Sequence, residues 1–169
     1  MNNSIRSTLV RAWLVIAGVD FVFASTLGVV AYGSTVARVW QGVASVVLGP
    51  SALQGGVRTV LVGVALHLCV AFTWTSVFLG LALLSERLRA IISTPGGVVA
   101  VAIVYGPLVW IVMSTVIIPT ATGRPPKFAA RWWVQAVAHR FFVALPIVAM
   151  VARGLGTSAR RTAALEPAS

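Results

Sequence analysis

Four ionisable residues lie in parts of the chain that are otherwise apolar: Asp20, His67, His139 and Arg140. An ionisable side chain inside a bilayer is costly, so such residues are by default candidates for function. Imidazole titrates near neutral pH, and two histidines facing each other can ligate a haem iron. These four residues are therefore the candidate polar cluster of the protein.

Three interpretations of this cluster are open. In the first, which we favour, the histidines are neutral and hydrogen-bonded, and Asp20 pairs with Arg140 or is protonated. In the second, Asp20, His67 and His139 form a proton or small-solute pathway. In the third, His67 and His139 are the two axial ligands of a haem. We expect no cofactor, with haem as the alternative, and no metal, because zinc needs three or four ligands.

The cluster is carried by four long apolar stretches. Each approaches or exceeds the ~20 residues that a helix needs to cross a ~30 Å hydrocarbon core. Backbone amides in lipid must be paired within their own segment, which predicts helices. The fold class is therefore an all-α membrane protein, a bundle of four transmembrane helices. The predicted spans are residues 12–33, 59–84, 96–118 and 132–152 of one domain, 1–154, followed by a flexible basic tail, 155–169.

Composition supports a membrane protein and argues against a nucleic-acid-binding one. The chain is 59% hydrophobic and 9% charged, with a mean hydropathy of +0.96, far from soluble proteins. Its net charge of +10 comes from arginines scattered near the ends of the spans, without a basic run. Such arginines face anionic headgroups. The expected partners are the lipid bilayer and other membrane subunits or a second copy of the chain, with no nucleic acid.

Depth in the membrane can be estimated at ~1.5 Å per residue. On that scale His67 lies about 13 Å and His139 about 12 Å below the same boundary, and Asp20 about 20 Å. The two histidines are thus expected to meet across the second and fourth helices. Asp20 is expected nearly two helical turns away from them.

Basic residues predict the orientation. Seven arginines lie on the side of the termini and five basic residues on the other, which favours two cytoplasmic termini. The first stretch exceeds the ~7–15 apolar residues of a signal peptide and contains Asp20, so we expect a retained span. The two sets are Arg6, Arg11, Arg87, Arg89, Arg153, Arg160 and Arg161 against Arg38, Arg58, Arg124, Lys127 and Arg131.

Residues 34–56, between the first two spans, predict a short amphipathic helix. Valines and Trp40 recur there at helical spacing, and Arg38, Gln41 and Ser45 fall on the opposite face. This pattern is typical of a helix lying in the membrane interface, ended by Gly49 and Pro50. A re-entrant segment is the alternative.

Small residues predict where helices approach one another, because membrane helices pack where Gly, Ala and Ser allow close contact. Three stripes with a spacing of four residues include members of the polar cluster or a tryptophan. Pro107 and Pro146 are expected to kink their helices. The stripes are Asp20, Ala24 and Gly28; Gly63, His67 and Ala71; and Gly106, Trp110 and Ser114.

The chain resembles a group of small bacterial four-span inner-membrane proteins. The resemblance rests on short motifs: Tyr105-Gly106, Val109-Trp110, Pro119, Gly123-Arg124-Pro125-Pro126, and His139 followed by Phe142-Val143 and Leu145-Pro146-Ile147. It implies four spans in a bacterial inner membrane. The group has no assigned activity, so the resemblance implies no functional residue, and Arg140 departs from its pattern.

The sequence offers little for catalysis. It has no Gly-rich phosphate loop, no His-Glu-x-x-His and no Gly-x-Ser-x-Gly, and it contains three acidic residues. We therefore expect a non-enzymatic protein, a structural or accessory subunit that packs with other membrane helices.

Overall fold

The computed structural model describes residues 3–163 and is helical throughout its regular structure. Four helical runs, each of at least 28 residues, are long and apolar enough to cross a membrane, which confirms the predicted fold class. Each run begins before its predicted span, and the third and fourth also end beyond it, whereas the first ends two residues short of its prediction, at Ala31. They comprise α1 (Asn3–Thr26) with a π-helical turn (Leu27–Ala31); α3 (Gly56–Leu84); α5 (Pro95–Val112), a π-helical turn (Met113–Ile117) and α6 (Ile118–Thr122); and α7 (Ala130–His139), a π-helical turn (Arg140–Ala144) and α8 (Leu145–Ala163).

The predicted tail, residues 155–169, is described only in part. Helix α8 continues through its first nine residues to Ala163, and residues 164–169 lie outside the described part of the chain.

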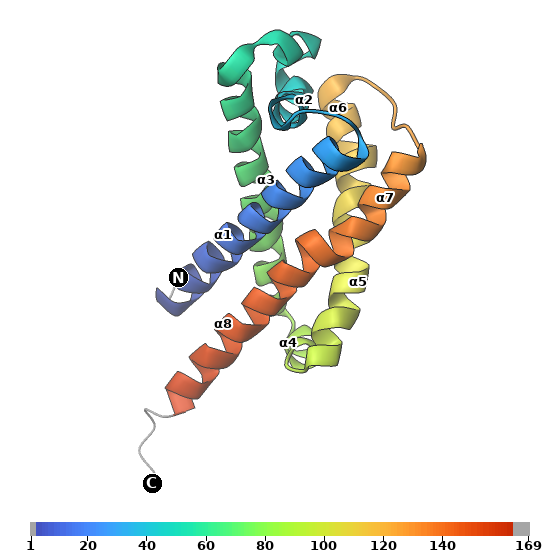
Figure 1. Cartoon of the computed structure of the whole chain (residues 1–169). Helices are drawn as coiled ribbons and strands as arrows, with labels where there is room; N and C mark the ends of the chain where they lie inside the picture. Colours follow the sequence, from blue (N-terminus) through green and yellow to red (C-terminus); the bar gives the residue numbers. More distant parts are fainter. Residues whose placement is uncertain (1–2, 164–169) are drawn as a thin grey trace.

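The long helices cross rather than run parallel. Helix α1 and the α7–α8 run lie side by side and pass obliquely over α3 and α5 (Figure 1). Their shared core is formed by fully buried aliphatic side chains, including Ile16, Ile147 and Val148. Tyr105 of α5 reaches α3, where its hydroxyl donates to the Trp74 carbonyl at 2.7 Å.

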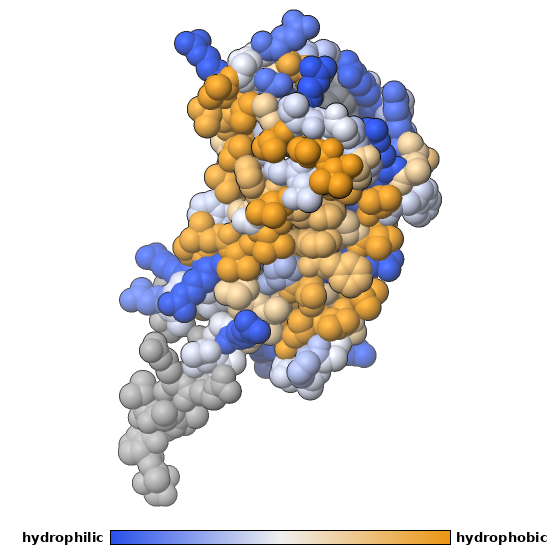
Figure 2. All heavy atoms as spheres, in the orientation of Figure 1, coloured by the Kyte–Doolittle hydropathy of each residue, from blue (hydrophilic) through white to orange (hydrophobic). Residues whose placement is uncertain are grey.

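The outer surface matches a bilayer environment. Figure 2 shows an orange hydrophobic body with blue hydrophilic side chains gathered toward its two ends. Large apolar side chains such as Leu61, Val104 and Leu84 are exposed along the spans. Contact with lipid hydrocarbon explains this exposure, which water would penalise.

Prolines account for two of the three π-helical turns. A proline has no N–H, and its ring collides with the carbonyl four residues earlier. For Pro119 that residue is Thr115, and for Pro146 it is Phe142, and both lie inside π-helical turns. Widening the turn by one residue relieves the collision. Helix α5, in contrast, stays α-helical through Pro107.

A shorter helix, α2 (Val36–Leu48), follows the first span as predicted. Thr35 caps its N-terminus by accepting a hydrogen bond from the Arg38 N–H, and Gly49 ends it with a φ of 77°. The packed face differs from the predicted one. Gln41, expected on the solvent side, is buried, because its Nε2 donates to the Gly56 carbonyl at 3.2 Å.

The connection between the second and third spans is also helical. Helix α4 (Glu86–Ile92) is capped by Ser85, whose hydroxyl accepts from the Leu88 N–H. Thr94 caps α5 in the same way, and Pro95 occupies the first helical position, where a missing N–H is harmless.

Candidate functional site

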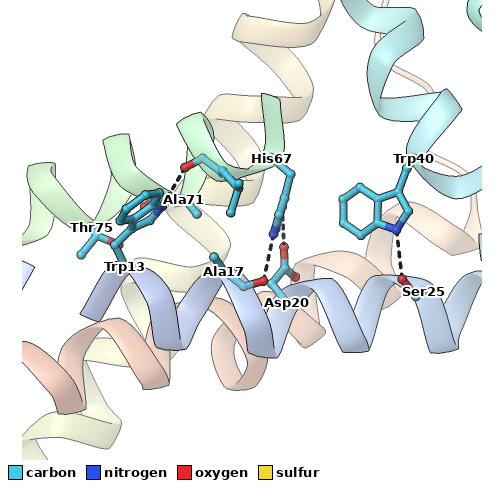
Figure 3. Close-up of polar contacts among 9 residues, drawn as sticks. Trp13, Ala17, Asp20, Ser25, Trp40, His67, Ala71 and Thr75 are labelled. Carbon is cyan, nitrogen blue, oxygen red and sulfur yellow. Dashed lines mark hydrogen bonds and ion pairs between the residues drawn. The ribbon is translucent and has the colours of Figure 1, made fainter. Parts of the chain in front are cut away.

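Asp20 and His67 meet where α1 crosses α3. The Nδ1 atom of His67 lies 3.5 Å from Oδ2 of Asp20, and its Nε2 lies 3.1 Å from the carbonyl oxygen of Ala17, one turn earlier on α1 (Figure 3). The side chain of His67 is only 10% exposed, so this contact is shielded by protein. One histidine thus links α3 to both the backbone and a side chain of α1.

These contacts fix the tautomer of His67. A carbonyl oxygen can only accept, so Nε2 carries a hydrogen and donates it to Ala17. The carboxyl group of Asp20 and Nδ1 of His67 then face each other across a separation longer than a usual hydrogen bond. The pair is either neutral, with the proton on Asp20, or ionised, with the proton on His67.

Trp40 of α2 completes this region, which we call the His67 region (Asp20, Ala17, His67, Trp40 and Gly63). Its ring packs at 5.0 Å from the imidazole and stacks on Phe21 at 4.5 Å. Its Nε1 donates to the Ser25 hydroxyl at 3.1 Å (Figure 3).

Gly63 allows α2 to approach this closely. It lies one turn before His67 on α3, and a Cβ atom there would overlap the backbone carbonyl of Trp40. The predicted stripe of small residues on α3 therefore faces a neighbouring helix, as expected.

His139 lies in a second, differently built region, the His139 region (Gly106, Trp110, His139 and Arg140). Its Nδ1 donates to the carbonyl of Gln135 on the same helix at 2.8 Å. Its ring centroid lies 4.8 Å from that of Trp110 on α5. A Cβ atom on Gly106 would come within 2.6 Å of the His139 carbonyl, so a glycine is again needed at the crossing.

Asp20 connects the two regions electrostatically. Its carboxyl group is close enough to interact with His139 as well as with His67. The expected separation of nearly two helical turns between Asp20 and His67 is wrong, because their side chains lie 3.5 Å apart. That estimate treated the helices as parallel, whereas α1 crosses α3 obliquely, so counting residues from the helix ends does not give comparable depths on the two helices (Figure 1).

Arg140 does not pair with Asp20, which was one alternative within the structural interpretation. It forms no ion pair among residues 3–163, and its Nε is buried without a hydrogen-bond partner there. Arg140 opens the π-helical turn that Pro146 favours, directly after His139.

The contacts of His67 do not fit a bis-histidine haem site. Iron binds an imidazole nitrogen that has a free lone pair. Nε2 of His67 bears a hydrogen bonded to Ala17, and Nδ1 faces Asp20, so binding would require breaking one of these contacts. Across the described residues, no three His, Cys, Asp or Glu side chains come together to hold a metal ion.

Sequence reasoning found the titratable residues and missed their partners. The Ala17 carbonyl carries no sequence signal, because any residue supplies one. Trp40 and Trp110 did carry one: Trp40 could meet the glycine stripe of a neighbouring helix, and Trp110 belongs to such a stripe on its own helix. Their contacts with the histidines follow from helix crossings that a single sequence does not specify.

Comparisons with family models, with curated proteins and with solved structures yield no match to this chain. The four long apolar helices therefore indicate a four-span membrane protein, and no family is identified.

Proposed function

We propose that this four-span integral membrane protein is a non-enzymatic structural or accessory subunit of a bacterial inner membrane. The observation that supports it best is the direct bonding of His67 to the Ala17 carbonyl, beside Asp20. A transport pathway needs polar groups that face water, whereas this imidazole is shielded and joins two helices. Such bonds between helices stabilise membrane bundles.

Association with other membrane helices is supported by small residues on the outside of the bundle. Gly18 of α1 and Gly80 of α3 have no atom within 4 Å of the position that a Cβ would occupy. Small residues are enriched where membrane helices meet, since they let the backbones approach closely. The protein partner in this proposal is another membrane helix, of a different chain or of a second copy.

A proton pathway is the second candidate. It is favoured by one observation, the 3.5 Å approach of the Asp20 carboxyl group to Nδ1 of His67 inside the bundle. Protonation could pass between groups arranged in this way along the interior of the bundle.

Two substitutions of Asp20 separate these candidates. Asp20→Asn keeps a donor that can reach Nδ1 of His67, so a structural role predicts near-normal stability, whereas Asp20→Ala leaves His67 without its partner. We expect Asp20→Ala to lower the free energy of unfolding, measured by denaturant titration, by about 1–2 kcal/mol. The value for Asp20→Asn should stay within about 0.5 kcal/mol of the native protein. Proton flux into liposomes should be equal in all three proteins. A folded Asp20→Asn protein that has lost a flux present in the native protein would replace the structural proposal with the proton pathway.

The proposed orientation places both termini in the cytoplasm, on the basis of the arginine distribution. Reporter domains fused after residue 169 and inserted within residues 85–95 should both report cytoplasm. A periplasmic signal from the C-terminal fusion would contradict this orientation.

A further inference from the structure

A cavity of about 740 Å³ opens at the end of the bundle where the second span passes into the third. It lies between the end of α4, the start of α5 and the middle turns of α8. Its walls combine apolar side chains, including Ile92, Val98 and Leu155, with two arginines, Arg89 and Arg153. A site that joins hydrocarbon-like walls to cationic groups at the end of the spans lies at the level of lipid headgroups.

The two arginine side chains differ in how many hydrogen bonds they make within the protein. Nη1 of Arg89 donates to the carbonyls of Ala82 and Leu83 at the end of α3, and Nη2 lies 3.5 Å from the Glu86 carboxylate. These bonds fix the Arg89 guanidinium at the cavity wall. The exposed side chain of Arg153 makes no hydrogen bond or ion pair within the described residues, so its N–H groups are open to a ligand.

The charge around the cavity is one-sided. Glu86 is the only carboxylate in α4, and it is engaged by Arg89. The N-terminus of α5, where Thr94 caps the helix, contributes the positive end of an 18-residue helix at the cavity wall. A smaller cavity of about 360 Å³ on the other side of α8 contains Arg153 again, together with Arg11.

We propose that the larger cavity binds an anionic phospholipid, independently of the function proposed above. The phosphate accepts hydrogen bonds from Arg153 and from the remaining N–H groups of Arg89. An acyl chain covers Val98 and Val99. The apolar walls favour a lipid over a free phosphate ion, because an ion would leave that surface uncovered. The arginines favour an anionic headgroup over a zwitterionic one, whose own cation they would repel.

The test is lipid retention by the full chain, purified in detergent and analysed by native mass spectrometry. The probes are phosphatidylglycerol and phosphatidylcholine with identical oleoyl chains, and inorganic phosphate as a competitor. Arg153→Gln removes the free cation. Arg87→Gln is its matched control, since Arg87 is an exposed arginine of α4, near Arg89 in sequence, and lines neither cavity. Val99→Trp fills the cavity and leaves every charge in place.

We expect the native protein to retain phosphatidylglycerol over phosphatidylcholine. Arg153→Gln should weaken phosphatidylglycerol retention about fivefold to tenfold, and Arg87→Gln less than about twofold. Val99→Trp should weaken it as well, and inorganic phosphate should compete poorly. Equal retention of the two lipids, equal effects of Arg153→Gln and Arg87→Gln, or full displacement by inorganic phosphate would each overturn the proposal. If Val99→Trp fails to fold, the two arginine variants decide the matter alone.

Discussion

His67 and His139 share a residue type and a similar expected depth, yet they bond in opposite ways. His67 donates across an interface, from α3 to the Ala17 carbonyl of α1. His139 donates to Gln135, four residues earlier on its own helix, and meets α5 only through ring contact with Trp110. The first histidine therefore fixes two helices relative to each other, and the second mainly fills space between them.

The polar atoms around the two histidines differ in the same sense. In the His67 region the Trp40 N–H has a partner in Ser25. In the His139 region Nε1 of Trp110 and Nε of Arg140 are buried without one, and these are two of the four such side-chain atoms among the described residues. Buried polar groups without partners are costly. A polar side chain introduced into the His139 region could bond to these atoms, so it should raise the free energy of unfolding more than one introduced into the His67 region.

The largest expected effect that tests this comparison concerns the glycines at the two crossings. Gly63→Ala forces a Cβ into the Trp40 carbonyl, so α2 and α3 must separate, whereas Gly106→Ala meets the His139–Arg140 backbone at 2.6 Å. We expect losses of about 3 and about 2 kcal/mol in the free energy of unfolding, measured by denaturant titration in micelles.

Gly42→Ala in α2 is the control for both, because no neighbouring group lies within 4 Å of its Cβ position. Replacing a glycine within a helix should leave stability unchanged or raise it by up to about 1 kcal/mol. A Gly63→Ala protein as stable as the Gly42→Ala protein would show that α2 does not pack tightly on α3.

A smaller effect is expected from removing the histidines themselves. His67→Ala loses a bond between helices and leaves Asp20 without its partner, so we expect a loss of about 2 kcal/mol. His139→Ala loses ring packing and a bond within one helix, for which about 1 kcal/mol is expected. The same micellar unfolding titration measures both, and a larger loss for His139→Ala would reverse the comparison.

The bundle itself was predictable, because an apolar stretch of about 20 residues strongly indicates a transmembrane helix. Four such stretches in one short chain predict a bundle of four helices. The π-helical turns could also have been anticipated at Pro119 and Pro146, where the ring must displace a carbonyl four residues earlier. The contact between Asp20 and His67 could not, since the tilt of a membrane helix depends on its neighbours and not on its own length. Gln41 shows the same limit, because its burial depends on the Gly56 carbonyl of another helix.

The smallest effect is expected from replacing the two tryptophans by phenylalanine, which removes one indole N–H from each region. Trp40→Phe keeps an aromatic ring against Phe21 and His67 but loses the N–H that Ser25 accepts, so about 1 kcal/mol should be lost. Trp110→Phe keeps a ring against His139 and removes a buried N–H that has no partner in the described structure. Its free energy of unfolding should therefore be unchanged or slightly raised, offset only by the smaller ring. Because both substitutions remove the same atoms, the difference between them measures how well each region satisfies its polar groups. Equal losses would mean that the Trp110 N–H has a partner in the membrane, and the contrast between the His67 and His139 regions would then reduce to the histidines alone.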